Sequence, residues 1–142
     1  MAKQKMIERR QRRALRQQFF RELRRPNPHV VRALALLEPA DQPDPRRIVV
    51  GVRPRDVNAS YVYATDRIVV NRDGDAYQHA VAGDCRRLAA SIAHEEMHRR
   101  GFGEAEAYLK TAKVLHDLKC DPSLVDHTVE CARDWAVIEG DR

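Results

Sequence analysis

Residues 88–112 read LAASIAHEEMHRRGFGEAEAYLKTA and contain two histidines, His94 and His98, four positions apart. On an α-helix such residues share one face, with their Cβ atoms roughly 6 Å apart. Two imidazoles placed in this way can occupy adjacent corners of a zinc tetrahedron, at Zn–N distances of about 2.1 Å. Glu95 follows the first histidine, where a carboxylate can accept a proton from zinc-bound water. The stretch therefore predicts a helix that carries a catalytic zinc site.

A catalytic zinc needs a third protein ligand and one open position. Residues 101–103 (Gly-Phe-Gly) end the helix, and a second helix, expected over residues 104–119, offers Glu104 and Glu106. At about 100° per residue, Glu104 falls in the middle of the apolar face of this helix and Glu106 on its polar face. A buried carboxylate costs several kcal/mol unless it is paired, protonated or metal-bound. We therefore predict Glu104 as the third ligand, with Glu106 as the alternative. A first-turn role for Glu104 facing the helix dipole needs no metal.

This region resembles the gluzincin branch of the HExxH zinc metallopeptidases, within the zincin superfamily. The resemblance rests on H-E-x-x-H at residues 94–98 and on an E-x-x-A-Y pattern at residues 104–108. The chain is similar to minimal single-domain gluzincins and, more distantly, to ImmA/IrrE-type peptidases. The short gap between the two motifs also fits a metzincin layout, but all three methionines, Met1, Met6 and Met97, precede the position of a Met-turn.

The resemblance implies a zinc-dependent metallopeptidase, a hydrolase of peptide bonds. Zn²⁺ would be held by His94, His98 and Glu104, and Glu95 would serve as general base and then as acid.

Two further residues, Tyr108 and His127, are candidates for the group that stabilises the oxyanion or contacts the substrate. Packing in the core explains Tyr108 equally well, and packing at the surface explains His127. A peptide substrate would add as a strand along a sheet edge, formed by residues 61–64 or 68–71. Two alternatives stay open: a non-catalytic binding module in which zinc stabilises the fold, and zinc-dependent amide hydrolysis of a non-protein substrate.

The remaining chain predicts an α+β fold, in which a small, mostly antiparallel sheet packs against the motif helix and the helices after it. Short β-branched runs predict strands at 48–52, 61–64 and 67–71, with a hairpin turn at Thr65-Asp66.

Helices are also expected at residues 29–38 and from the cap Asp121-Pro122-Ser123 to about residue 138. A linker is expected over residues 39–45 and an irregular segment over residues 72–83. Asp84 is the expected N-cap of the motif helix, which should end near residue 100.

Basic charge is concentrated at the N-terminus. Residues 1–25 hold ten Lys or Arg and two Glu, a net charge of +8, whereas residues 26–142 carry a net charge of −3. We expect residues 1–25 to be a basic amphipathic helix and residues 26–142 to be a zincin-like metallopeptidase domain. The helix has three interpretations: docking of its apolar stripe (Ile7, Ala14, Leu15, Phe19, Leu23) on the domain, contact with nucleic acid or an acidic partner, or occlusion of the cleft.

Composition places the chain among soluble globular proteins. The 142 residues are 43% hydrophobic and 33% charged, and no apolar run approaches the ~20 residues that span a membrane. No apolar segment suits a secretory signal. The three cysteines form no C-x-x-C pair and cannot all form intrachain disulfides. We expect reduced thiols, a cytoplasmic location and no membrane partner.

Overall fold

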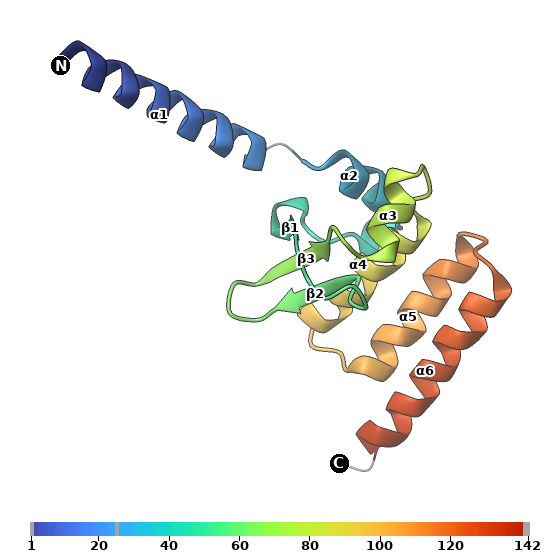
Figure 1. Ribbon diagram of the computed structural model, residues 1–142. Helices are drawn as coiled ribbons and strands as arrows, with labels where there is room; N and C mark the ends of the chain where they lie inside the picture. The colour runs from blue at the N-terminus through green and yellow to red at the C-terminus, as the bar shows by residue number, and fades with distance from the viewer. Residues whose placement is uncertain (1, 25, 141–142) are drawn as a thin grey trace.

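The computed structural model describes residues 2–24 and 26–140, with the backbone alone described over 17–24 (Figure 1). Helices and a small sheet confirm the predicted α+β class. The helices are α1 (Ala2–Arg24), α2 (Pro28–Ala35), α3 (Asp75–Val81), α4 (Arg86–Arg99), α5 (Glu104–Asp117) and α6 (Pro122–Gly140). The strands are β1 (Ile48–Gly51), β2 (Ala59–Val62) and β3 (Arg67–Asn71), and two 3-10 turns, Pro39–Asp41 and Pro45–Arg47, precede β1.

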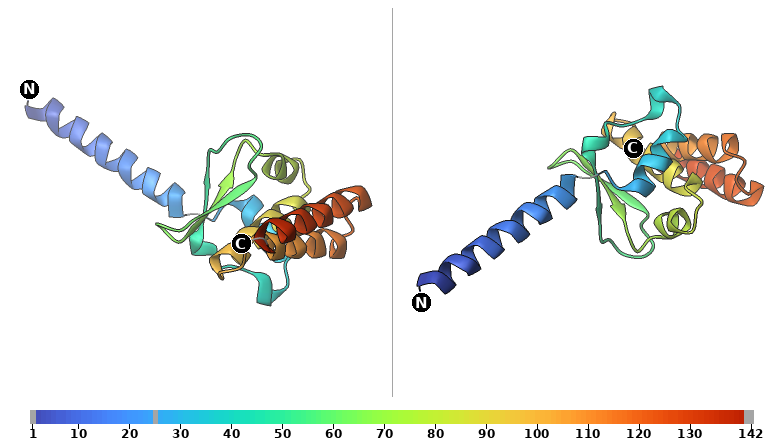
Figure 2. Two further views of the ribbon diagram at one scale, coloured as in Figure 1. Left: turned by 90° about the horizontal axis from the view of Figure 1, so that it is seen from below. Right: turned by 90° about the horizontal axis from the view of Figure 1, so that it is seen from above.

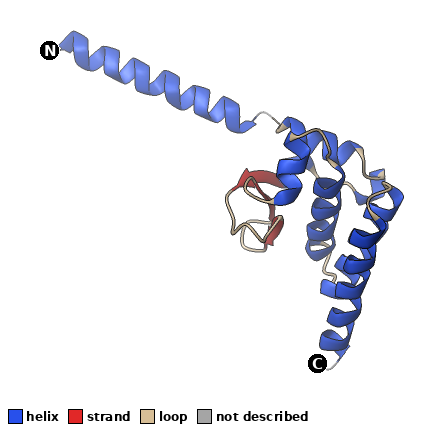
Figure 3. Ribbon diagram, turned by 45° about the vertical axis from the view of Figure 1, so that its right-hand side comes forward, coloured by secondary structure: helices blue, strands red, loops and turns tan. Residues whose placement is uncertain are grey.

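Helix α4 lies at the centre of the fold and carries the HExxH motif. It contacts β2 and β3 of the sheet and also α2, α3 and α5, while α6 packs on α5 (Figures 1 and 3). One face of α4 is buried in the core, and it is formed by Leu88, Ala89, Ile92 and Ala93. The two alanines leave room for neighbouring elements to approach closely, so that α4 is held rigidly on several sides.

The sheet is mixed, and the prediction of a mostly antiparallel sheet is wrong. Its strand order is β1-β3-β2: β2 and β3 form the predicted antiparallel hairpin, and β1 pairs parallel with β3. Residues 52–58 reverse the chain after β1 and the hairpin reverses it again, so β1 and β3 run in the same direction. The buried Asn71 side chain fixes this loop, since it accepts from Arg53 N and donates to Pro54 O and Val57 O.

The segment 72–83, expected to be irregular, contains α3. Its Ala76, Tyr77 and Ala80 are buried against the core, which supplies the stability that so short a helix lacks alone. Gly74 and Gly83 bound this helix rather than break a chain without structure.

Asp84 is not the N-cap of α4, which is Cys85. Asp84 instead accepts from the Arg86 amide and binds the Arg86 guanidinium, whose hydrogen bond lowers the pKa of the Asp84 carboxyl to about 2.

Helix α1 projects away from the other elements in Figures 1 and 2. Met6, Ile7 and Leu15 are each more than half exposed, so the apolar stripe is not docked on the domain over residues 2–16. The side chains of Phe19 and Leu23 lie outside the described residues. Among the described residues, no helix is long and apolar enough to cross a membrane.

Candidate metal centre

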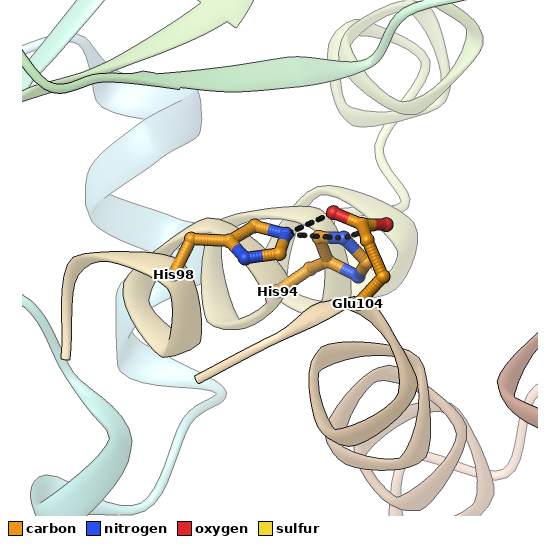
Figure 4. A group of neighbouring side chains, drawn as sticks. All are labelled: His94, His98 and Glu104. Carbon is orange, nitrogen blue, oxygen red and sulfur yellow. Dashed lines mark hydrogen bonds and ion pairs between the residues drawn. The ribbon is translucent and has the colours of Figure 1, made fainter. Parts of the chain in front are cut away.

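Three side chains predicted as ligands lie together: His94 and His98 on α4, and Glu104 on α5 (Figure 4). The two Nε2 atoms are 3.3 Å apart, and His94 Nε2 is 3.6 Å from Glu104 Oε2. His98 Nε2 contacts Glu104 Oε1. Around a zinc ion with bonds of about 2.1 Å, neighbouring ligand atoms are about 3.4 Å apart. The His94–His98 and His94–Glu104 distances are close to this value, and the candidate ligand atoms of all three residues lie within 4.8 Å of one another. Glu106, in contrast, is exposed on the opposite face of α5.

The turn after α4 orients His98. Gly101 adopts a positive φ of 93°, and the Gly101 and Phe102 amides donate to His98 O and Met97 O, each at 3.0 Å. This is a Schellman motif, which favours glycine at that position. It brings the Phe102 carbonyl to 3.0 Å from His98 Nδ1. A carbonyl can only accept, so Nδ1 carries the proton and a neutral His98 presents the Nε2 lone pair to the cluster.

Thr111 on α5 orients His94 in the same way. Its hydroxyl donates to Ala107 O at 2.9 Å and therefore accepts from His94 Nδ1, also at 2.9 Å. His94 Nε2 is then unprotonated as well. Burial, and secondly the nearby His98, lower the pKa of His94 to about 4, so the ring is neutral near pH 7.

These residues fit a zinc ion by the chemistry of their donor atoms. When both imidazoles are neutral, their Nε2 lone pairs and the Glu104 carboxylate converge, and a bound cation would offset the repulsion between these groups. Each imidazole also donates its other N–H to a fixed oxygen, as metal-bound histidines do. Two His and one Glu form a known catalytic zinc ligand set.

Glu139, near the end of α6, holds the first turn of α5. Its carboxylate accepts from the amides of Glu104, at 3.2 Å, and Ala105, at 2.8 Å. A Cβ at Gly103 would collide with this carboxylate, so a larger residue there would displace the Glu139 side chain from the two amides. A carboxylate on the amides of a helix N-terminus is favourable, and here it fixes the backbone that carries Glu104.

Glu95 points toward the edge of the sheet. Its Oε2 accepts from Tyr61 N at 2.8 Å, so the outer edge of β2 lies beside the cluster. Burial raises the pKa of Glu95 to about 7, although His98 and the hydrogen bond from Tyr61 lower it. Of the two strands proposed as a substrate edge, the residues in β3 are central in the sheet, whereas β2 is an edge strand.

Two pockets meet at the cluster. One, of about 650 Å³, includes His94, Glu95, Glu104 and Tyr108. Further polar residues line it from α4 and from other parts of the chain: Arg87, Ser91, Asp56, Asp75 and Thr128. The second, of about 420 Å³, includes Glu95, His98 and Glu104 and lies between β2 and the end of α6.

The structure separates the two remaining candidates for oxyanion or substrate contact. The Tyr108 ring lies edge-on to His94, with centroids 4.6 Å apart, and burial raises the pKa of its hydroxyl. His127 is exposed on α6 beside Cys131 and lines neither of these two pockets. Only Tyr108 is therefore brought to the cluster.

Glu96, in the middle of the HExxH motif, has a structural role. Glu96 is 2% exposed and binds the guanidinium groups of Arg99 and Arg100, with Nε–Oε1 distances of 2.9 and 3.1 Å. Arg100 also donates to Ala40 O. These two arginines therefore neutralise a buried carboxylate.

Comparisons with family models, curated proteins and solved structures found no match to this chain. The resemblance to zincins therefore stays a prediction that rests on the residues described above.

Proposed function

We propose that this protein is a zinc-dependent metallopeptidase that hydrolyses peptide bonds. The observation that carries the proposal is the convergence of His94 Nε2, His98 Nε2 and the Glu104 carboxylate, with both Nδ1 protons already bound elsewhere. Glu95, next to the cluster and on the same helix, is the feature that favours catalysis over a purely structural ion.

His94, His98 and Glu104 would hold the ion. When bound, zinc supplies a Lewis acid for a substrate carbonyl and for a water molecule. Glu95 would accept a proton from that water and return it to the leaving amine. Tyr108, whose ring packs against His94, would contact the substrate near the developing oxyanion. The edge of β2 would align an extended peptide, since the backbone groups of Ala59 face the same side as the Tyr61 amide.

The test is metal content and peptide hydrolysis of the purified full chain and three variants. We expect one zinc per chain in the wild type, in Glu106→Ala and in Glu95→Gln, but not in Glu104→Ala. Hydrolysis of a casein-derived peptide mixture should persist in Glu106→Ala and be lost in Glu95→Gln. Glu106→Ala is the matched control, since it removes an exposed carboxylate from the same helical turn.

Three results would contradict the proposal. Full zinc retention in Glu104→Ala would remove Glu104 from the ligand set. Unchanged hydrolysis in Glu95→Gln would remove Glu95 as the base. Zinc binding without hydrolysis of any peptide would favour the binding module, in which the ion only stabilises the fold.

We also propose a polyanionic partner for α1, and nucleic acid as its class. Lys5, Arg9, Arg12 and Arg16 follow one another at helical spacings of four, three and four residues, so they share one face, and all four are exposed. Such a stripe matches a row of phosphates.

The free thiols of Cys85, Cys120 and Cys131 support a reducing, cytoplasmic location.

A further inference from the structure

The smaller of the two pockets at the cluster has aromatic walls. Tyr61, Tyr63, Phe102 and Trp135 all line it, from β2 and the turn after it, the α4–α5 turn, and α6. Residues 26–142 contain only six Phe, Tyr or Trp residues. Four of the six therefore gather around one pocket of about 420 Å³.

These rings are not part of the hydrophobic core. Tyr63 is 76% exposed and Phe102 is 43% exposed, whereas Tyr77 is buried among the core residues. Exposed aromatic surface is unfavourable in water, so a cluster of such rings at the mouth of a pocket indicates a binding surface.

Two of the four rings are held by contacts within the protein. The Tyr61 hydroxyl donates to Asp66 Oδ1 at 2.6 Å, and the rings of Tyr61 and Tyr63 pack edge-on with centroids 4.7 Å apart. The Glu139 carboxylate at the pocket wall is occupied by two backbone amides. Outside the metal cluster, the pocket walls therefore present mainly the faces and edges of aromatic rings to a ligand.

The two sides of the metal cluster therefore differ in chemistry. The aromatic pocket lies beside His98, and the pocket beside His94 contains Arg87 and two aspartates, Asp56 and Asp75. A chain that crosses the cluster along β2 would leave one side chain in the aromatic pocket, next to the reacting bond.

We propose that this pocket binds the aromatic side chain of a substrate residue adjacent to the cleaved bond, so that the preferred substrates are peptides with Phe, Tyr or Trp at that position. The proposal rests on the metallopeptidase function proposed above. Aromatic rings pack well edge-on or offset against other rings, which favours Phe over a small side chain at this site.

Trp135 is the only tryptophan in the chain, so its fluorescence reports on this pocket. We would titrate zinc-loaded Glu95→Gln protein with the N-acetylated, C-amidated peptides Ala-Ala-Phe-Ala-Ala and Ala-Ala-Ala-Ala-Ala. The Phe peptide should change Trp135 emission and bind at least tenfold more tightly. Adding Tyr63→Ala or Phe102→Ala should reduce this preference to below threefold. Leu109→Ala, which removes an exposed apolar side chain of α5 outside both pockets, should leave it unchanged.

Equal affinity for the two peptides would overturn the proposal, as would a preference that survives in both Tyr63→Ala and Phe102→Ala. Since Tyr63 is largely exposed, its substitution should leave the fold intact, and circular dichroism would verify this. Binding is measured in a variant that lacks the proposed base, and cleavage of the Phe peptide is followed separately in the wild type by mass spectrometry. A failure of the pocket and a failure of the peptidase function are therefore distinguishable.

Discussion

At the scale of single residues, the orientation of His98 depends on Gly101. The positive φ of Gly101 permits the Schellman turn, and that turn places the Phe102 carbonyl on His98 Nδ1. A side chain at this φ costs about 1–2 kcal/mol. Gly101 therefore shapes the turn that determines which ring nitrogen of His98 faces the Phe102 carbonyl.

We predict that Gly101→Ala lowers the free energy of unfolding by about 1–2 kcal/mol and weakens zinc binding about tenfold or more. Denaturant unfolding of the metal-free protein and a competition titration with a zinc chelator measure the two effects. Gly83→Ala is the matched control, since Gly83 also has a positive φ, of 108°, but lies at the end of α3. A similar loss of zinc affinity in both variants would contradict the proposed link through Phe102.

A second prediction concerns the buried carboxylate of Glu96. Replacing Arg99 and Arg100 together by alanine leaves this charge buried without its partners, and breaking a buried pair in this way costs about 3–5 kcal/mol. Glu96→Gln leaves two arginines that are partly exposed and can be solvated, so it should cost less. Denaturant unfolding compares the two variants. If Glu96→Gln proved the more destabilising, the arginines would not be the groups that compensate the buried charge.

The sequence predicted the three candidate ligand residues that the structure brings together, but not the groups that orient them. Spacing puts His94 and His98 on one face of their helix, and periodicity puts Glu104 on the apolar face of the next helix. The contact between Thr111 and His94 could have been predicted, because Thr111 is seven residues after Glu104 and so falls on the same apolar face of the helix. No sequence pattern indicated the hydrogen bond from Tyr61 N to Glu95, since a backbone amide donates it and the two residues are 34 apart in the chain.

At the scale of secondary-structure elements, α6 fixes α5 through Glu139. The carboxylate binds the first amides of α5, where the helix dipole also favours a negative charge. Glu139 is therefore a positioning residue for Glu104, and it acts from the far end of the C-terminal helix.

We predict that Glu139→Ala lowers the free energy of unfolding by about 0.5–2 kcal/mol, as lost caps do, and raises the zinc dissociation constant about 10-fold. Glu139→Gln, which keeps one acceptor, should fall between Glu139→Ala and the wild type. Glu130→Ala, an exposed site on the same helix, is the control. Calorimetric zinc titration measures the affinities, and equal affinities for Glu139→Ala and Glu130→Ala would show that the cap does not position Glu104.

Elements with a strong local signal were predictable, and their pairing was not. The β-branched runs predicted the hairpin, although its first strand lies at 59–62 rather than at 61–64, because residues 63–66 form the turn. The parallel pairing of β1 depends on the loop held by Asn71. Helix α3 was missed because its seven residues lie between two glycines and are stabilised by burial rather than by propensity.

At the scale of the whole molecule, positive charge and the candidate site occupy different parts. The site is built from α4, α5 and the edge of β2, and the described part of the basic stripe lies on α1. Helix α1 projects from the other elements (Figure 1). A partner could therefore bind the exposed basic residues of α1 without covering the pockets at the cluster. Partner binding and hydrolysis should therefore be separable by substitution.

The stripe on α1 predicts a salt-dependent affinity for nucleic acid. For duplex DNA, the slope of log K against log salt is about −0.9 for each phosphate contacted. Replacing Lys5, Arg9, Arg12 and Arg16 by Gln, which keeps helix propensity, should make the slope shallower by about 3.6 and leave zinc binding unchanged. Fluorescence anisotropy with a labelled 20-base-pair duplex at several salt concentrations measures the slope. Four exposed arginines outside α1, Arg55, Arg67, Arg72 and Arg133, provide a control of equal charge change. An equally large change of slope in this control variant would show that DNA binding depends on net charge rather than on α1. Tighter binding of polyglutamate than of the duplex would indicate that the partner of the stripe is an acidic protein.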